Sequence, residues 1–333
     1  MGDCGAFSYR SAKEPPYTVD DTLEFYEDGG FTHGCSVDHL IFDFLDDNAR
    51  APAEARRRQA ITLNNAEQFL IAARALGRGF TPVGVIQGWS PKSMAQAAVS
   101  LCNMGYKYLA VGGMVPLRID QIEQALAAIR DAIPGRVRLH VLGFGKTEEL
   151  DRLRKYKIAS FDTTSPLVRA FKDGKRNYYA RTQSGELEYY IAVRIPQAID
   201  NDKLLRRAKK GRLNQESLLR LEANALRAVR DFANRRASLE DAIAGVIAYG
   251  RYALWDDTVD DARNEARLRT LRASYARTLG DRPWESCRCR VCRESGVEAL
   301  IFRSSNRNKR RGMHNLHVFY THLLEEIRSE TAA

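Results

Sequence analysis

The stretch 83–88 reads Val-Gly-Val-Ile-Gln-Gly, and the stretch 108–113 reads Tyr-Leu-Ala-Val-Gly-Gly. Each begins as a short apolar run and ends in small or polar residues. Apolar residues at helical spacing follow both stretches, over 91–104 and 119–132. Short apolar strands that alternate with amphipathic helices predict a parallel sheet covered by helices. These two units therefore place the chain in the α/β class.

The same strand–helix unit recurs on both sides of these two. The strands expected there are 39–42, 137–142 and 158–161, which end in Asp43, in Gly143-Phe144-Gly145 and in Asp162, with helices over 65–76 and 148–155. Five such units without a dinucleotide-binding glycine pattern favour a (β/α)8 TIM-type barrel over a doubly wound sheet. In both folds functional side chains gather at the carboxyl ends of the strands, where these glycines and aspartates fall.

A cluster of possible metal ligands lies near the end of the chain. Cys287, Cys289 and Cys292 fall within six residues, and His314 follows them. Three thiolates and an imidazole can close around one tetrahedral ion, for which Zn²⁺ is the preferred occupant, and four protein ligands make such a site structural. A disulfide with a spare thiol is the alternative for the cysteines. His317, about one helical turn beyond His314, is the alternative fourth ligand.

The charge balance favours a polyanionic partner. The 333 residues include 52 Lys and Arg against 42 Asp and Glu, a formal net charge of +10. Two basic runs, over 203–212 and 303–311, are the predicted phosphate contacts, and a solvated helix face is the alternative for each. The side chains concerned are Arg206, Arg207, Lys209 and Lys210 in the first run and Arg307, Lys309, Arg310 and Arg311 in the second.

Composition and hydropathy also bear on location and domain organisation. No apolar run is long enough to cross a bilayer, and six cysteines, three of them clustered, fit a reducing compartment. We therefore predict a soluble, cytoplasmic protein with no membrane partner. Three segments are expected: a barrel core over 1–170; a hairpin, a basic segment and helices over 171–283; and a zinc-binding subdomain with a C-terminal helix over 284–333.

Several short motifs occur in an order that resembles the tRNA-guanine transglycosylases. They are Asp-Cys-Gly-Ala-Phe at 3–7, Asp43, Val-Ile-Gln-Gly at 85–88, Ala-Val-Gly-Gly at 110–113, Phe-Asp at 161–162, and the cysteine cluster with Met-His-Asn-Leu at 313–316. The resemblance implies a barrel with a structural zinc site. It also implies a glycosyltransferase that replaces guanine in a nucleic acid with a 7-deazaguanine.

Departures from the family pattern indicate which branch is nearest. Cys4 stands where the family has a serine and Ala6 where it has a glycine, and the wording Gly-Ala-Phe-Ser-Tyr at 5–9 is more similar to the DNA-directed branch, the DpdA type. DNA is therefore the expected substrate and a base such as preQ0 the expected co-substrate. The alternatives are a tRNA enzyme of the queuosine or archaeosine type and an inactive zinc-containing nucleic-acid-binding homologue. Family members carry early strands before the first motif, so we expect an incomplete barrel or a natural start upstream of Met1.

Two aspartates carry the chemistry that the resemblance implies. Asp162 would attack the anomeric carbon and form a covalent glycosyl-enzyme intermediate. Asp3 would be the general acid/base that protonates the departing guanine and deprotonates the incoming base. The alternatives are a helix-capping role for Asp162 and a flexible terminus for Asp3. The target nucleotide must leave its stack to reach a barrel mouth, which implies base flipping or a single-stranded substrate.

The base-binding residues that the resemblance implies are Asp43, Gln87, Gly112, Gly113 and Phe7. Asp43 would accept hydrogen bonds from the purine edge, with Asp38 as the alternative, and Gln87 offers both a donor and an acceptor. Glycines let backbone amides approach a base closely. Phe7 either stacks on the base or belongs to the core. The implied partners are a nucleic acid and the free base, and a companion protein or a second copy of the chain is left open.

Overall fold

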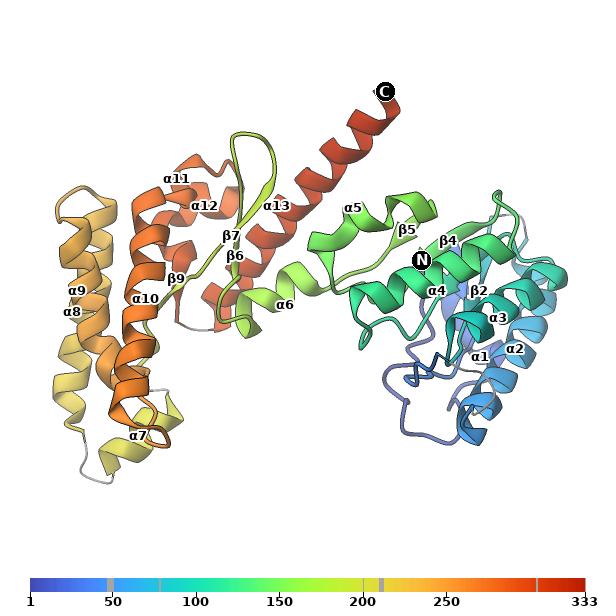
Figure 1. Ribbon diagram of the computed structural model, residues 1–333, viewed down its shortest axis with the longest axis horizontal. Coiled ribbons are helices and arrows are strands. Elements are labelled where there is room, and N and C mark those ends of the chain that lie inside the picture. Colours follow the sequence, from blue (N-terminus) through green and yellow to red (C-terminus); the bar gives the residue numbers. More distant parts are fainter. Residues whose placement is uncertain (47–50, 78, 200, 210–212, 304, 333) are drawn as a thin grey trace. The chain divides into compact units, whose positions relative to one another are not determined.

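A computed structural model describes residues 1–46, 51–77, 79–199, 201–209, 213–303 and 305–332 (Figure 1). The chain forms two compact units, Met1–Ser165 and Pro166–Ala333. Each unit has hydrophobic clusters of its own. None of the helices in the described part of the chain is both long enough and apolar enough to span a bilayer.

The first unit is built on a five-stranded parallel sheet whose strands lie side by side in chain order. The strands are β1 (His33–Cys35), β2 (Thr81–Ile86), β3 (Tyr108–Val111), β4 (Arg138–Val141) and β5 (Ser160–Phe161). The helices are α1 (Val19–Asp28), α2 (Ala53–Ala72), α3 (Pro91–Met104), α4 (Ile119–Ala132) and α5 (Leu150–Leu153), with short 3₁₀ turns at Ala73–Leu76, Thr147–Glu149 and Arg154–Tyr156.

The strand order decides between the two α/β architectures. Crossovers between parallel strands are right-handed, so an unbroken order puts the connecting helices on one face of the sheet. Helices α2, α3 and α4 pack beside one another on that face (Figure 1). A doubly wound sheet would instead reverse its order at a switch point. The α/β class is confirmed as a curled parallel half-barrel, whereas closure into eight strands is not observed among the described residues.

The first strand lies earlier than its hydropathy predicts. The apolar run 39–42 is irregular chain, and β1 (His33–Cys35) pairs with β2 instead, with His33 opposite Thr81. Gly34 allows this because a side chain there would overlap the rings of Tyr26 and Phe80. Leu40 and Ile41 are apolar because they are buried beyond the strand end. The prediction of a strand over 39–42 was therefore wrong, and helix α2 also begins earlier than predicted, at Ala53.

Side chains alternate across the sheet as the pleat requires. Ile86, Leu109 and Val141 are buried on the face that packs against α3 and α4. Val85 and Ala110 point to the opposite face, where they form a smaller buried cluster. The loops after the strands therefore emerge from a sheet that is packed on both faces.

The second unit combines two small sheets with a set of helices. A hairpin of β6 (Tyr178–Arg181) and β7 (Leu187–Tyr190) is antiparallel, and β8 (Val193–Arg194) pairs with β9 (Ile301–Phe302). The helices are α6 (Ser165–Lys172), α7 (Asp202–Lys209), α8 (Gln215–Ala233), α9 (Leu239–Ala253), α10 (Asp261–Asp281), α11 (Pro283–Ser286), α12 (Arg290–Ser295) and α13 (Ser305–Ala332), with a 3₁₀ turn at Gly296–Leu300. One hydrophobic cluster joins the hairpin, helices α7 to α10 and the cysteine segment.

Candidate active site and metal centre

Three carboxylates line one cavity of about 320 Å³ at the carboxyl ends of the strands of the first unit. Asp38 lies beyond β1, Asp162 directly follows β5, and Asp3 comes from the N-terminal segment. That segment is tied to the sheet, because the Gly2 N–H donates to the His33 carbonyl at 2.8 Å and the Gly2 carbonyl accepts from the Cys35 N–H at 3.0 Å. Asp3 is thus held at the cavity and does not lie on a flexible terminus.

Asp162 is held as an anion by donors on β4 and in the loop that follows it. Its Oδ1 accepts from the Gly143 N–H at 2.8 Å and lies 3.3 Å from Nε2 of His140. Burial alone would raise the pKa of Asp162, but the hydrogen bonds from His140 and Gly143 outweigh that effect and lower the pKa below its ordinary value. The side chain stays 56% exposed, so an ionised oxygen faces the cavity.

His140 was not among the predicted site residues. It is buried on β4, with Nδ1 2.6 Å from the Ser160 hydroxyl, which in turn lies 2.5 Å from the Tyr108 hydroxyl. The chain of bonds is satisfied when Tyr108 donates to Ser160, Ser160 donates to Nδ1, and Nε2–H donates to Asp162. A histidine within the apolar run 137–142 was the only sequence signal for this role.

Asp3 titrates in the opposite direction from Asp162. Asp3 is exposed to solvent on one side, but partial desolvation by the surrounding protein raises the pKa of its carboxyl; the N–H groups of Gly5 and Cys4 oppose the shift, and the nearby Asp162 carboxylate adds to it. Two carboxyl groups of one cavity whose pKa values are pushed apart are suited to different roles, one as an anion and one as a proton donor.

Asp38 belongs to a buried polar network on the same cavity. Its two oxygens accept from the Gln87 amide at 2.6 Å and from the Cys4 thiol at 3.1 Å, and burial raises its pKa to about 6. The Gln87 carbonyl oxygen accepts from the Ile41 N–H at 3.2 Å. Asp43, in contrast, is exposed and is absent from the cavity lining. The structure thus brings Asp38, the alternative, to the site and leaves Asp43 outside it.

The remaining predicted base-binding residues also lie at this cavity. Gly112 and Gly113 line it, and Gly113 has φ of +74° with the Ile41 carbonyl 2.8 Å from where a Cβ would stand. Phe7 is 56% exposed and touches Phe42 edge-on, with ring centroids 6.4 Å apart. Phe7 is therefore an accessible wall of the cavity and not part of the core.

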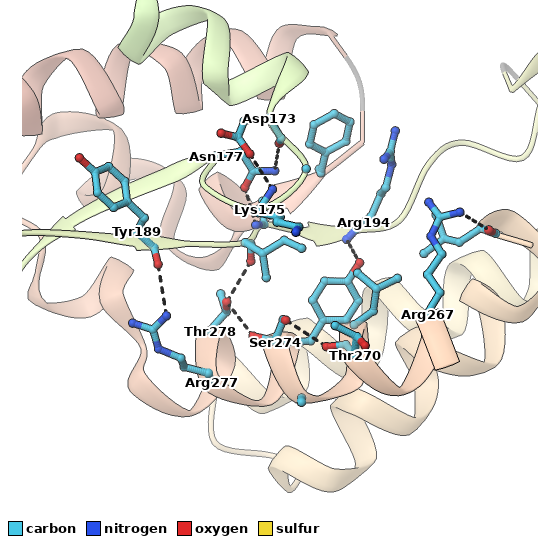
Figure 2. A pocket seen from close by; sticks show the side chains of 18 of the residues that line it. Asp173, Lys175, Asn177, Tyr189, Arg194, Arg267, Thr270, Ser274, Arg277 and Thr278 are labelled. Carbon is cyan, nitrogen blue, oxygen red and sulfur yellow. Dashed lines mark hydrogen bonds between the residues drawn. The ribbon is translucent and has the colours of Figure 1, made fainter. Parts of the chain in front are cut away.

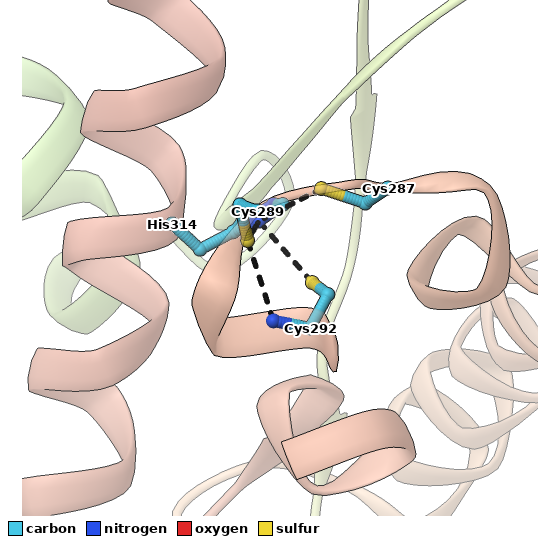
Figure 3. A group of neighbouring side chains, drawn as sticks. All are labelled: Cys287, Cys289, Cys292 and His314. Carbon is cyan, nitrogen blue, oxygen red and sulfur yellow. Dashed lines mark hydrogen bonds between the residues drawn. The ribbon is translucent and has the colours of Figure 1, made fainter. Parts of the chain in front are cut away.

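The four predicted metal ligands lie together in the second unit (Figure 3). The ligand atoms of Cys287, Cys289, Cys292 and His314 all lie within 4.8 Å of one another. Nδ1 of His314 is 3.3 Å from the sulfurs of Cys289 and Cys292 and 3.6 Å from that of Cys287. The six cysteines are free, so the disulfide alternative is not realised, and His317 is exposed outside the cluster.

Strand β6 orients the histidine of this cluster. Nε2–H of His314 donates to the Tyr179 carbonyl at 2.7 Å, which leaves Nδ1 as the free acceptor that a metal needs. The Tyr178 ring stacks on the imidazole with centroids 4.0 Å apart, and its hydroxyl lies 3.2 Å from the Cys292 sulfur. The donor set and its support fit a closed tetrahedral site.

The predicted phosphate contacts in the first basic run are only partly available. Arg206 and Lys209 are exposed, Arg207 is paired with Asp257 at 3.1 Å, and Lys210 lies outside the described residues.

The second basic run contains one residue that was predicted wrongly. Lys309 and Arg310 are exposed, and Arg307 pairs with Glu298. Arg311 is completely buried, with its guanidinium donating to the Ala170 carbonyl at 2.7 Å, so it cannot reach a phosphate. Its neighbours Lys309 and Arg310 lie on the surface of the helix that faces solvent, whereas Arg311 faces the core of the unit.

Comparison with known proteins agrees with the site. The chain is 40% identical over 327 residues to a DNA-guanine transglycosylase of Salmonella montevideo, covering 97% of this chain and 75% of that protein. No protein-family model matches the chain. The fold and the site together define an α/β half-barrel protein with a carboxylate-lined cavity and a Cys₃His cluster. The chain belongs to the guanine transglycosylase family, in its DNA-directed, DpdA-type branch, and is a glycosyltransferase.

Proposed function

We propose that this protein replaces guanine in DNA with a 7-deazaguanine such as preQ0 through a covalent aspartyl-glycosyl intermediate. The observation that carries the proposal is the pair Asp3 and Asp162, which line one cavity and have pKa values shifted in opposite directions. The name of the Salmonella montevideo relative supports DNA as the polymer. A tRNA substrate is the alternative.

In the first half-reaction Asp162 attacks the anomeric carbon of the target nucleotide. The bond from that carbon to guanine N9 breaks as the bond to the Asp162 oxygen forms, and Asp3 supplies the proton that the departing guanine takes up. In the second half-reaction the incoming base loses its N9 proton to Asp3 and attacks the same carbon, which releases Asp162. Both aspartates return to their starting states, so no further reactant is required.

The base would be held by the network around Asp38. An ionised Asp38 can accept from the amine and ring N–H of a guanine-like edge, and Gln87 steadies it at 2.6 Å. Gly112 and Gly113 offer backbone groups with no side chain in the way, and Phe7 offers a flat exposed ring. We assign the reading role to Asp38 and not to Asp43, because Asp43 does not line the cavity.

Cys287, Cys289, Cys292 and His314 would hold a structural Zn²⁺. Thiolate and imidazole donors select zinc over Mg²⁺ or Ca²⁺, and four protein ligands leave no position for a substrate. The ion would therefore stabilise the second unit and take no part in base exchange. The six free cysteines support a reducing compartment, and we propose the cytoplasm.

A base-exchange assay tests the proposal. Labelled guanine should enter DNA and not tRNA when each is offered alone to the wild-type protein. Asp162→Asn should bind DNA but exchange nothing, because the amide keeps the shape and removes the nucleophile. Asp3→Asn should slow exchange by roughly 10²–10⁴-fold. Labelling of tRNA alone would overturn the DNA assignment, and normal exchange by Asp162→Asn would overturn the mechanism.

A further inference from the structure

A second and larger cavity, of about 800 Å³, lies wholly within the second unit (Figure 2). It is bounded by the turn after α6, by the chain from β7 to β8, by one side of α10 and by Phe302 of β9. The carboxylates of the candidate active site (Asp3, Asp38 and Asp162) do not line it, and neither do the four metal ligands. Its size is within the range of roughly 300–1,000 Å³ that is typical of pockets for small ligands.

Five basic side chains and one acidic side chain line this cavity. The basic ones are Lys172, Lys175, Arg194, Arg267 and Arg277. The acidic one, Asp173, is already occupied, because its carboxylate accepts from the backbone N–H groups of Lys175 at 2.7 Å and Arg176 at 2.9 Å. Asp173 keeps its negative charge, but the five cations outnumber it, so the potential of the cavity is positive.

Most of these cations have no carboxylate partner. Arg277 pairs with Glu188, but no ion pair to Lys172, Lys175, Arg194 or Arg267 is found among the described residues. The Arg267 guanidinium makes a single long contact, to the Leu254 carbonyl at 3.4 Å. Many other arginines of this chain pair within it, as Arg230 does with Glu298 at 2.7 Å. All four side chains are exposed to solvent, so this group of cations is accessible to an anion from outside the chain.

The other lining groups indicate what kind of anion fits. The hydroxyls of Thr270, Ser274 and Thr278 along α10 donate to backbone carbonyls at 2.9–3.0 Å, so their protons are not free for a ligand. The charged donors of the lining are the five cations. Arg194 stacks over the Phe302 ring at 4.8 Å, and Phe171, 37% exposed, adds a second aromatic surface. Cations interleaved with aromatic rings are typical of surfaces that bind single-stranded nucleic acid.

We propose that this cavity binds a single-stranded stretch of the phosphodiester backbone of the nucleic-acid substrate. The inference rests on the proposed function in one respect: the bound strand belongs to the same nucleic acid whose guanine is exchanged. Arg194 and Arg267 contact phosphates, and the exposed ring of Phe171 receives the adjacent sugar or base, since the guanidinium groups of Arg194 and Arg311 already cover the Phe302 ring. A single strand can present bases as well as phosphates to this cavity, which matches a reaction that takes its target base out of the stack.

The test is the salt dependence of single-stranded DNA binding by the full chain. Arg194→Gln with Arg267→Gln removes two contacts, and the slope of log K against log salt should fall by about 0.7 for each. The control is Arg269→Gln with Arg227→Gln, which removes the same charge at exposed positions outside the cavity, Arg269 from the same helix as Arg267. Arg194→Lys with Arg267→Lys keeps the charges and should keep the slope.

Three results would overturn the proposal. The first is an unchanged slope in the Arg194 and Arg267 double glutamine variant, with the fold verified by circular dichroism. The second is an equal fall in the control, which would mean that net charge alone is sensed. The third is full displacement of the strand by deoxythymidine monophosphate at a concentration as low as that at which the strand itself binds, which would indicate a small-ligand site. Binding is measured without a 7-deazaguanine and repeated in the Asp162→Asn background, so a failure of base exchange cannot be mistaken for a failure of this site.

Discussion

At the scale of single residues, the contact with His140 helps to lower the pKa of Asp162, the proposed nucleophile. His140→Phe keeps the packing of β4 and removes a hydrogen bond to a charged group, which is worth about 1.5–3 kcal/mol. We expect kcat to fall at least about tenfold. Because the lost contact lowers the pKa of Asp162, the acidic limb of the pH–rate profile should move to higher pH.

His140 acts as a positioning residue, because it works through Asp162. A purely structural role would lower the rate without shifting the pH–rate profile, so the shift of the profile is the decisive measurement. Ser160→Ala, one bond further from Asp162, should shift the same limb by less. A loss of rate in His140→Phe that is uniform at all pH values would contradict the assignment.

A second prediction concerns how stability depends on pH through Asp38. Burial raises the pKa of this carboxyl to about 6 from an ordinary value of 3.8. Its neutral form is favoured in the folded state, so the stability that it contributes is complete below pH 3.8 and is lost as pH rises to about 6. At 1.36 kcal/mol per pKa unit the loss is on the order of 3 kcal/mol. Asp38→Asn should then be at least as stable as the wild type at pH 8, by thermal unfolding.

Base binding should show the opposite dependence on pH. The purine edge donates hydrogen bonds, so it needs the ionised carboxylate, and affinity for the free base should rise up to about pH 6 and then level off. Asp38→Asn should lose both the affinity and its pH dependence. Equal affinity in the variant would show that Asp38 does not read the base.

At the scale of elements, the turn after β3 (Tyr108–Val111) forms part of the cavity that we propose binds the base. Gly113→Ala introduces a side chain at φ +74° and within 2.8 Å of the Ile41 carbonyl. The left-handed conformation costs roughly 1–2 kcal/mol, and the clash moves the backbone that faces the base. We expect KM for the free base to rise by roughly tenfold, with a modest loss of stability, in steady-state kinetics and thermal unfolding.

Gly135→Ala is the matched control for that substitution. A Cβ at Gly135 meets nothing within 4 Å, so stability and kinetics should be unchanged or slightly improved. If both alanine variants behave alike, the turn does not shape the base cavity.

At the scale of the whole molecule, the two units should respond differently to metal removal. Structural zinc sites contribute on the order of 10 kcal/mol, which is comparable with the stability of a domain. The three cysteine ligands belong to, or pack against, the main hydrophobic cluster of Pro166–Ala333. Chelation of the metal should therefore unfold that unit and leave Met1–Ser165 folded. Calorimetry and limited proteolysis should show one transition lost and one retained.

Single variants make the metal prediction specific. His314→Ala should lose stoichiometric zinc, whereas His317→Ala should keep it, because His317 is exposed outside the cluster. Full zinc content in His314→Ala would contradict the ligand set. Loss of both thermal transitions on chelation would show instead that the first unit depends on the metal.

The sequence by itself determined those features that depend on local pattern. Apolar runs such as 83–86 and 108–111 formed buried parallel strands, and the close spacing of Cys287, Cys289 and Cys292 specified a ligand group. Placement of Gly112, Gly113 and Asp162 on one cavity followed from a rule of parallel sheets, that carboxyl ends of strands share an edge.

Tertiary structure alone decided the features that depend on contacts between distant segments. Asp38 and not Asp43 reached the cavity because β1 (His33–Cys35) is fixed by pairing with β2, which the hydropathy of 39–42 concealed. Arg311 looked like its basic neighbours but faces the core, since the orientation of a helix in its unit is set by packing. The cavity gathers Lys172 and Lys175, Arg194, and Arg267 from three separate segments, and only folding brings their charges together.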